Sequence, residues 1–328
     1  MAGAGPPRVF VTRDLPGSGL SRLRTVAEVD VWPERLPPPP RVLRERAARA
    51  DGLITLLTDQ VDADLLDACP RLRVVANVAV GYDNLDVAEL TRRGIPAGNT
   101  PGVLTESTAE LAWALILGAS RRLVEGVNAV LSGEWLTWEP AFLLGQELHG
   151  GVLGIVGMGR IGQAVARRAQ GYDMSVVAWS RKPKALPGLE VRWVGLDELL
   201  ATADVVSLHC ALTPETHHLI GAAQLARMKP TAVLVNTARG PVVDQPALAE
   251  ALRARRIAAA GLDVTEEEPI PLDDPLLGLP NCLVLPHIGS ATVQARSKMA
   301  DMAVDNVLAA LAGQPLPTCI NPAALRTR

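Results

Sequence analysis

Hydrophobic and polar positions follow two alternating patterns along the first part of the chain. Short apolar runs, typical of buried strands, alternate with stretches whose apolar residues recur at helical spacing. The strand-like runs cover residues 8–11, 29–32, 52–57 and 74–80, and the helical stretches cover 20–27, 42–50, 62–69 and 86–93. Strands that alternate with helices predict a parallel sheet covered on both faces, so we expect a small open α/β domain here.

A long apolar helix is expected next, after Ser107, which has the spacing of a capping box with Glu110. A helix this apolar should be buried at a domain or subunit boundary. The alternation then resumes, with expected strands at 152–156, 175–179, 191–194, 205–208, 232–236, 257–262 and 283–285 and expected helices at 161–168, 197–203 (capped by Asp197), 222–228, 245–256 and 291–312. This part therefore predicts a second parallel α/β sheet.

The most specific motif of the chain follows the apolar run 152–156. Gly157, Gly159 and Gly162 have the G-x-G-x-x-G spacing between that strand and a helical stretch. In this context the first glycine allows a sharp turn, the second lets backbone approach a pyrophosphate, and the third lets helix and strand pack closely. The motif predicts a Rossmann-type dinucleotide-binding domain. The alternative is a glycine-rich turn without a ligand.

The end of the next expected strand indicates which dinucleotide is bound. An NAD site usually has an Asp or Glu there, which binds the ribose 2′-hydroxyl. This chain has Ser180, Arg181 and Lys182 instead. A hydroxyl and two cations would hold a 2′-phosphate that a carboxylate would repel, so NADP is favoured and NAD is the weaker alternative. Otherwise Arg181 and Lys182 belong to a solvated loop.

Composition narrows the class of protein. The 328 residues have room for two domains, and 48% are hydrophobic, which supports full cores. The net charge of −3 gives no electrostatic basis for binding nucleic acid or an anionic membrane, and no apolar run is long enough to cross a bilayer. The scattered cysteines predict neither a disulfide framework nor a metal site. The N-terminus lacks the order of a signal peptide, and we expect a cytoplasmic enzyme.

Candidate reacting groups follow several of the expected strands. Arg239, Asp263 and His287 come just after strand ends, where ligands gather in doubly wound sheets. The guanidinium of Arg239 would hold a 2-keto acid carboxylate, and His287 would transfer the proton that accompanies a hydride. Glu268 would fix the histidine tautomer and favour its protonated form. Each residue also has a non-catalytic alternative. Arg239 could form a surface ion pair, Glu268 could belong to a solvated acidic run, and His287 could be a buried histidine with its hydrogen bonds satisfied.

Several segments spread over most of the chain resemble one enzyme family. They are NVAVGYDNLD (77–86), NTPGVLTESTAELAWALIL (99–117), VLGIVGMGRIGQAVARRA (152–169), VNTARGPVVDQPAL (235–248), AAAGLDVTEEEPIP (258–271) and LPHIGSAT (285–292). The chain resembles the D-isomer-specific 2-hydroxyacid dehydrogenases and, within them, the glyoxylate/hydroxypyruvate reductases. The resemblance implies NADPH-dependent reduction of glyoxylate and hydroxypyruvate to glycolate and D-glycerate.

The same resemblance assigns roles to individual residues. It implies a catalytic trio of Arg239, Glu268 and His287. The implied substrate-binding residues are Val80 and Gly81, whose backbone faces the carboxylate, Leu56 and Leu57 on the methylene side, and Arg239, His287 and Trp138. The implied cofactor contacts are Gly159, Arg160, Ile161, Arg181, Ala211, Thr237, Asp263 and Gly289. The glycine motif and the cationic loop already make Gly157, Gly162, Ser180 and Lys182 cofactor candidates, and we also expect Arg239 and His287 beside the cofactor. No metal ligand is implied.

The family also implies how the chain is divided. Residues 1–102 and 288–328 would form a flavodoxin-like substrate domain, and residues 103–287 the NADP-binding Rossmann domain. Both would be open parallel-sheet domains, with the active site in the cleft between them, closed by hinge motion.

A homodimer is a further expectation from the resemblance. An arm at about 105–148 would join two subunits, and Trp138 would reach the neighbouring active site. Independently of the family, Trp135, Trp138 and Phe142 form an aromatic cluster outside the expected core elements, which suggests an interface. Packing of these rings within the chain is the alternative.

Two other functions compete with this hypothesis. One is an NAD-dependent dehydrogenase of different specificity, such as a D-3-phosphoglycerate dehydrogenase, which would want additional cations near the substrate. The other is a non-catalytic nucleotide-sensing corepressor or scaffold on the same fold. The sequence contains nothing that resembles a basic or disordered partner-binding tail.

Overall fold

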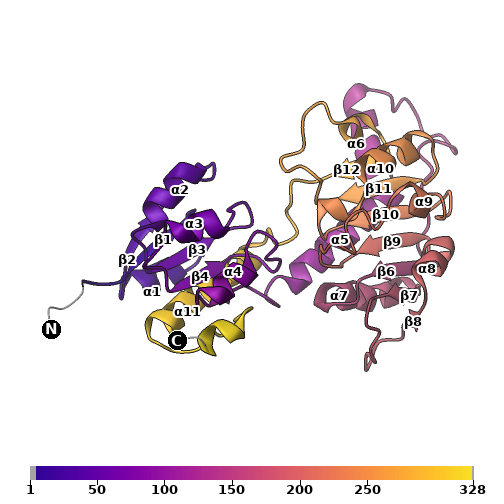
Figure 1. Ribbon diagram of the computed structural model, residues 1–328. Helices are drawn as coiled ribbons and strands as arrows, with labels where there is room; N and C mark the ends of the chain where they lie inside the picture. Colours follow the sequence, from indigo (N-terminus) through magenta and orange to yellow (C-terminus); the bar gives the residue numbers. More distant parts are fainter. Residues whose placement is uncertain (1–4, 327–328) are drawn as a thin grey trace. The chain divides into compact units, whose positions relative to one another are not determined.

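The computed structural model describes residues 5–326, which form two compact units (Figure 1). The first unit is Met1–Leu104 with Ser290–Arg328, and the second is Thr105–Gly289. The chain thus leaves the first unit after Leu104 and returns to it after Gly289, in each case two residues beyond the predicted boundary. Both units are parallel-sheet α/β folds, which confirms the predicted fold class.

Within the described residues, five parallel strands build the sheet of the first unit in the order β2-β1-β3-β4-β5. They are β1 (Arg8–Val11), β2 (Glu28–Val31), β3 (Gly52–Thr55), β4 (Val74–Asn77) and β5 (Ala97–Gly98). This is the flavodoxin-like order, which reverses direction between β1 and β3. β3 and β4 are buried along their whole length, which explains their continuous apolar sequences.

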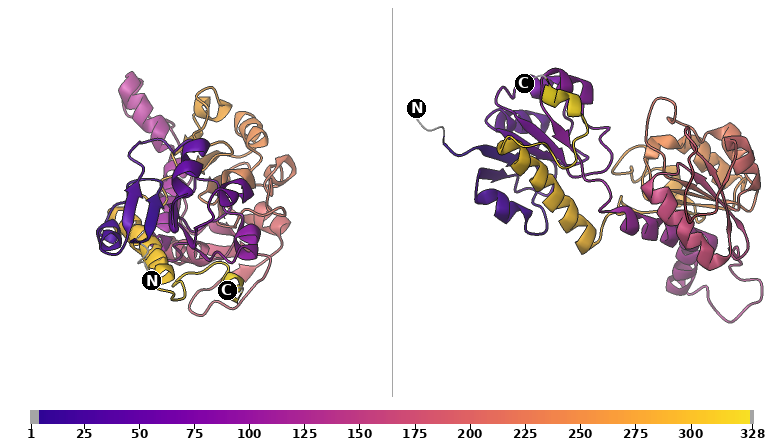
Figure 2. Two further views of the ribbon diagram at one scale, coloured as in Figure 1. Left: turned by 60° about the vertical axis from the view of Figure 1, so that its left-hand side comes forward. Right: turned by 90° about the horizontal axis from the view of Figure 1, so that it is seen from below.

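Helices cover both faces of this sheet. One face packs against α1 (Gly19–Arg24) and α11 (Val293–Leu311), and the other against α2 (Pro40–Ala47), α3 (Ala63–Asp67) and α4 (Val87–Arg92). α11, at the yellow end of the colour scale in Figure 2, lies beside α1 and against β3 and β4. Its fully buried Val304 and Val307 share a core with Ile54 and Val74. The far end of the chain therefore completes the core of the first unit.

The sheet of the second unit has seven parallel strands within the described residues, in the order β12-β11-β10-β9-β6-β7-β8. They are β6 (Val152–Val156), β7 (Ser175–Trp179), β8 (Arg192–Trp193), β9 (Val205–Leu208), β10 (Val233–Asn236), β11 (Ala259–Leu262) and β12 (Cys282–Val284). This is the Rossmann order with one added strand, and it reverses between β6 and β9. The G-x-G-x-x-G turn directly follows β6, at this reversal point.

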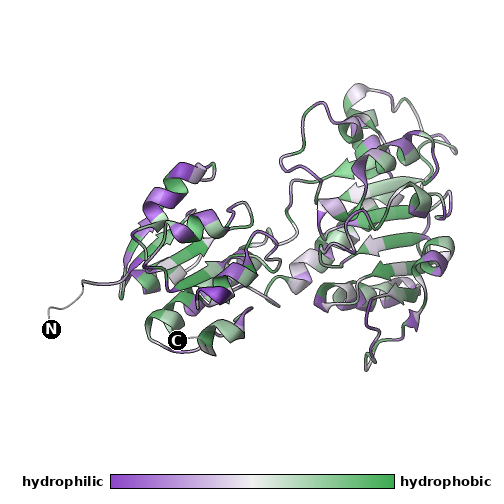
Figure 3. Cartoon of the chain, viewed as in Figure 1, coloured by the Kyte–Doolittle hydropathy of each residue, from purple (hydrophilic) through white to green (hydrophobic). Residues whose placement is uncertain are grey.

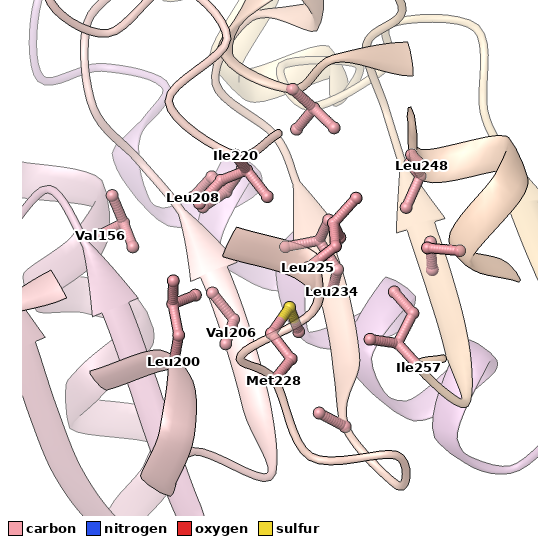
Figure 4. Close-up of a cluster of buried hydrophobic side chains, with 14 of the residues drawn as sticks. Val156, Leu200, Val206, Leu208, Ile220, Leu225, Met228, Leu234, Leu248 and Ile257 are labelled. Atoms are coloured by element: carbon pink, nitrogen blue, oxygen red, sulfur yellow. The ribbon is translucent and has the colours of Figure 1, made fainter. Parts of the chain in front are cut away.

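Two helical layers enclose the second sheet. α5 (Thr105–Ser120) and α7 (Arg160–Ala169) pack on one face, and α8 (Leu196–Thr202), α9 (Ala222–Leu225) and α10 (Gln245–Arg253) pack on the other. Figure 4 shows the second of these cores, in which Leu208 and Leu234 of the strands meet Leu225 of α9. Figure 3 shows the consequence, since the strands are mainly hydrophobic while polar residues gather on helix surfaces and loops.

The remaining helical segments are short or peripheral. α6 (Leu123–Ser132) projects from the rest of its unit (Figure 2), and single-turn 3₁₀ helices lie at η1 (Gln170–Tyr172), η2 (Gly240–Val242), η3 (Pro275–Gly278) and η4 (Pro322–Arg326). Among the described residues, none of the helices has both the length and the apolar character needed to cross a membrane.

Two predicted helix caps are wrong. α5 begins at Thr105, so Ser107 and Glu110 lie inside the helix, where Ser107 and Thr108 are buried. Because these small side chains pack inside the unit, the helix begins two residues before Ser107, its expected cap. α8 follows Gly195, and Asp197 lies in the first turn of this helix. There the negative charge of Asp197 interacts favourably with the positive end of the helix dipole, but the residue does not cap the helix.

Candidate active site

The three motif glycines each meet a different physical requirement. Gly157 has φ +97°, and a Cβ there would lie 2.5 Å from the backbone nitrogen of Cys210. A Cβ on Gly162 would collide with the carbonyl oxygen of Gly157, so this glycine allows helix and turn to pack closely. A Cβ on Gly159, which precedes α7, would meet no atom within 4 Å. The turn is therefore tight where it packs and open at Gly159, as a pyrophosphate cradle requires.

A cation stands where an NAD site usually has a carboxylate. Ser180, Arg181 and Lys182 directly follow β7, and Arg181 is 57% exposed. Its Nη1 donates to the Oε2 atom of Glu215 at 3.5 Å. A hydrogen bond from the Thr213 side chain is the main cause that lowers the pKa of Glu215, so this carboxylate is ionised beside the arginine. These residues fit a 2′-phosphate, with Glu215 as a competitor for the guanidinium.

A half-buried histidine lies beside the expected cofactor contacts, at the carboxyl edge of the second sheet. His209 follows β9, and burial lowers its pKa to about 3. Its ring nitrogens lie 2.8 Å from Ser207 Oγ and 3.3 Å from Thr237 Oγ1. This neutral ring fixes Thr237, one of the expected cofactor contacts. Ala211, another of them, follows on the same loop.

The expected acid and its carboxylate partner are in direct contact. His287 Nδ1 lies 2.7 Å from Glu268 Oε2, and both side chains are partly exposed, at 27% and 32%. The other oxygen of Glu268 accepts from the backbone N–H of Thr265 at 3.2 Å. Glu268 is therefore oriented by its own loop, and it holds one nitrogen of the histidine ring.

Asp263 holds the turn that carries His287. Its Oδ1 accepts from Ile288 N and its Oδ2 from Gly289 N, both at 2.7 Å, while its carbonyl accepts from His287 N at 2.9 Å. His287 itself has φ +53°, a conformation that needs such support. Burial is the main cause that raises the pKa of Asp263, and the two backbone hydrogen bonds oppose it. Sequence reasoning treated Asp263 only as a cofactor contact and missed this clamp.

Arg239 lies on the neighbouring loop. It follows β10, which pairs with β11, and the backbone of Gly240 packs so closely on Thr265 that a Cβ at Gly240 would collide with it. The Nδ2 of Asn236 donates to the carbonyl of Arg239 at 2.8 Å, and the guanidinium Nη1 donates to Ala238 O at 2.9 Å. The arginine loop and the Glu268 loop are thus packed together at the carboxyl edge of the sheet. Within residues 5–326, no group of three or more His, Cys, Asp or Glu side chains is placed to hold a metal ion.

Comparison with known proteins agrees with this architecture. The model of the D-isomer specific 2-hydroxyacid dehydrogenase NAD binding domain matches residues 113–289. The glyoxylate reductase of Korarchaeum cryptofilum is 50% identical over 325 residues, with 98% of each chain covered. The chain belongs to the D-isomer-specific 2-hydroxyacid dehydrogenase family. As a member, it is an NAD(P)-binding oxidoreductase of 2-hydroxyacids.

Solved structures of the family have the same fold. A Thermus thermophilus protein superposes with a TM-score of 0.91 at 49% identity, covering 95% of this dehydrogenase and 99% of that chain. An NADPH-dependent glyoxylate/hydroxypyruvate reductase from Sinorhizobium meliloti, in complex with NADP and malonate, superposes with a TM-score of 0.85 at 33% identity over 98% of both chains.

The substrate contacts expected in the first unit follow two paired strands of the dehydrogenase. Leu56 and Leu57 come after β3, and Val80 and Gly81 after β4. Because parallel strands end at the same edge, these residues lie on neighbouring loops. Leu57 is 38% exposed, and Val80 and Gly81 are half-buried.

Large apolar side chains are exposed on α6 and the segment after it. This arm surface consists of Leu123, Val127, Val130, Leu131, Trp135, Leu136, Trp138 and Leu144, each between 56% and 86% exposed. The aromatic cluster therefore does not pack within the chain as the alternative expected, since Trp138 is 80% exposed. Exposed apolar side chains that lie this close together in sequence are typical of an interaction surface.

Proposed function

We propose that this dehydrogenase reduces glyoxylate and hydroxypyruvate with NADPH. The observation that carries the proposal is the contact between His287 and Glu268 at the sheet edge where the glycine cradle also lies. NADPH, when bound, supplies the hydride. The names of the relatives support glyoxylate as a substrate, and the Sinorhizobium enzyme supports hydroxypyruvate and NADPH.

The chain's own residues supply the proton and the orientation. Glu268 holds Nδ1 of His287, so Nε2 of the protonated ring is the atom that donates to the substrate carbonyl oxygen. Proton loss leaves a neutral ring whose Nδ1–H still bonds to Glu268. Asp263 keeps the ring in place by fixing the turn that carries it. Arg239 holds the substrate carboxylate and polarises the carbonyl.

The proposal also includes the contacts that the family resemblance implies. Val80 and Gly81 offer backbone to the substrate carboxylate, and Leu56 and Leu57 border its methylene side. Arg160, Ile161, Thr237 and Gly289 contact the cofactor, along with the glycine turn.

Replacement of the proton donor tests the mechanism. We expect His287→Ala to lower kcat for glyoxylate by about 10²–10⁴-fold, the usual contribution of a general acid, while the Kd for NADPH is unchanged. His149→Ala, which removes an exposed ring paired with Asp173, is the matched control and should keep wild-type turnover. Wild-type turnover in the His287 variant would remove this residue from the acid role. A wild-type protein that consumes no NADPH with either keto acid would favour a scaffold function.

A charge reversal tests the choice of cofactor. Arg181→Asp places a carboxylate where the 2′-phosphate would bind, and we expect the ratio of NADPH to NADH affinity to fall by roughly 10–100-fold. Arg227→Asp is the control, because Arg227 is another half-exposed arginine paired with a carboxylate in the same unit. An unchanged ratio in the Arg181 variant would refute the NADP assignment.

The exposed arm surface supports a homodimer in which Trp138 reaches the neighbouring active site. We expect Leu131→Asp, which charges a side chain that is 80% exposed, to convert a dimer to a monomer in analytical ultracentrifugation. A wild-type protein that sediments as a monomer would contradict this part of the proposal. The proposal also includes a cytoplasmic location, which the scattered cysteines predict.

A further inference from the structure

Three successive carbonyl groups after β4 are all hydrogen-bonded toward the inside of the first unit. Ala79 O accepts from the backbone N–H of Thr100 at 2.9 Å. Val80 O accepts from Asn99 Nδ2 at 2.8 Å, and Gly81 O accepts from Asn77 Nδ2 at 3.1 Å. The side chains of Asn77 and Asn99 are buried, so both amides act from behind the loop.

The direction of these carbonyls decides where the neighbouring N–H groups point. Across a trans peptide bond, the C=O and the N–H point in opposite directions. The only cis bond in the described chain is Glu268–Pro269. The N–H groups of Val80, Gly81 and Tyr82 therefore point away from the interior, and within residues 5–326 none of them donates a hydrogen bond. These residues are half-buried or exposed, which leaves the N–H groups accessible.

The amide of Asn77 is itself fixed by a buried network. Its Oδ1 accepts from Thr55 Oγ1 at 3.1 Å, and its Nδ2 also donates to Asn84 Oδ1 at 3.0 Å. Asn84 Nδ2 then donates to Leu56 O at 3.1 Å and to Asp59 O at 2.8 Å. One network therefore sets the orientation of the loop after β4 and of the loop after β3.

We propose that Asn77 and Asn99 are positioning residues that turn the N–H groups of Val80, Gly81 and Tyr82 outward to bind the substrate carboxylate. The inference rests on the proposed function and adds two side chains and a third backbone donor to it. Successive N–H groups on one side of a loop form a binding site for an anion, and hydrogen bonds to a charged acceptor are stronger than neutral ones. The loop thus recognises a carboxylate with backbone alone, because the amides hold its carbonyls on the opposite side.

The test compares buried asparagines of the same unit. Asn77→Ala frees the carbonyl of Gly81, and we expect the KM for glyoxylate to rise on the order of 10–100-fold, with a matching loss of affinity for the unreactive carboxylate oxamate in the presence of NADPH. The Kd for NADPH alone should not change. Asn321→Ala is the control, since the Asn321 amide is also buried and donates to Ile95 O at 3.0 Å, and among the described residues no hydrogen bond joins the Asn321 side chain to a carbonyl of residues 79–81. It should lose similar stability yet keep the wild-type KM.

Asn99→Ala provides an independent variant should the Asn77 variant not fold, because it releases the neighbouring carbonyl of Val80. A rise in KM and in the oxamate Kd in the folded Asn77 variant, without change in the Asn321 variant, supports the inference, and the Asn99 variant decides only if the Asn77 variant does not fold. An unchanged KM in the deciding variant, or an equal rise in the Asn321 variant, overturns it. A wild-type enzyme that does not reduce glyoxylate would instead refute the proposed function, and oxamate binding would still report on the loop.

Discussion

The two sheets reverse direction at equivalent places, and the two crevices there are filled differently. Between β6 and β9, Gly159 has no atom within 4 Å of the position its Cβ would take. Between β1 and β3, fully buried Thr12 donates from Oγ1 to Asp59 Oδ2 at 2.5 Å, and Leu56 N donates to the same oxygen at 2.8 Å. The reversal point of the second unit therefore has free space beside Gly159, while that of the first is filled by its own side chains.

This difference shows that topology supplies a crevice and side-chain size decides its use. A reversal of strand order leaves a gap at the carboxyl edge of any doubly wound sheet. Glycines keep the gap free in the second unit. In the first unit a hydroxyl and a carboxylate occupy it, and the backbone N–H groups available to a ligand lie instead on the loop after β4.

The largest expected effect comes from filling the open crevice. Gly159 has φ −75° and ψ −163°, an extended conformation that does not require glycine, so Gly159→Val should leave the thermal midpoint nearly unchanged. Its side chain would occupy the space of the pyrophosphate, and we expect the Kd for NADPH to rise roughly 10–100-fold, as measured by fluorescence titration.

Gly195→Val is the matched control for that variant. Gly195 also precedes a helix of the second unit in an extended conformation, and a Cβ there would meet no atom within 4 Å. Equal losses of NADPH affinity in both variants would mean that the Gly159 space is not the cofactor site.

A smaller effect is expected at the closed crevice. Thr12→Val keeps the shape but removes a donor to the buried Asp59, and the free energy of unfolding should fall by about 1–3 kcal/mol in urea titrations, with NADPH affinity unchanged. Burial raises the pKa of Asp59, and the lost hydrogen bond had favoured its ionised form. The destabilisation should therefore be full at neutral pH and shrink as the pH falls through the folded-state pKa, where the carboxyl binds a proton. A loss of NADPH affinity would break the contrast between the two crevices.

The smallest effect concerns the exposed carboxylate at the open crevice. Glu215→Gln removes the competitor of the 2′-phosphate for Arg181, and we expect the Kd for NADPH to fall about 2–5-fold while that for NADH stays the same. Glu198→Gln, which removes an exposed carboxylate paired with Arg192, is the control. Weaker NADPH binding in the Glu215 variant would show that this carboxylate orients the arginine instead.

The local pattern of apolar residues alone predicted most of the helices and strands. For three strands of the second unit it also predicted the observed first and last residues. β6, β7 and β9 are short, apolar and bounded by turn residues, so their sequences show where they begin and end. Sequence reasoning did not identify α6, although Leu123, Val127, Val130 and Leu131 recur at helical spacing. It also missed the two residues of β5, which are too few to show a period.

Residue chemistry and spacing by themselves indicated the parallel α/β fold class and the glycine cradle, and the resemblance to the family added to the chemical argument for Arg239, Glu268 and His287 as candidates. Only the tertiary structure decided that Glu268 contacts His287 across nineteen residues of chain, that Asp263 clamps the histidine turn, and that two asparagines orient the loop after β4. The periodicity of apolar residues indicates which residues of one segment are buried. Hydrogen bonds between separate strand ends depend on which strands pair and how their loops pack, and no local pattern records that.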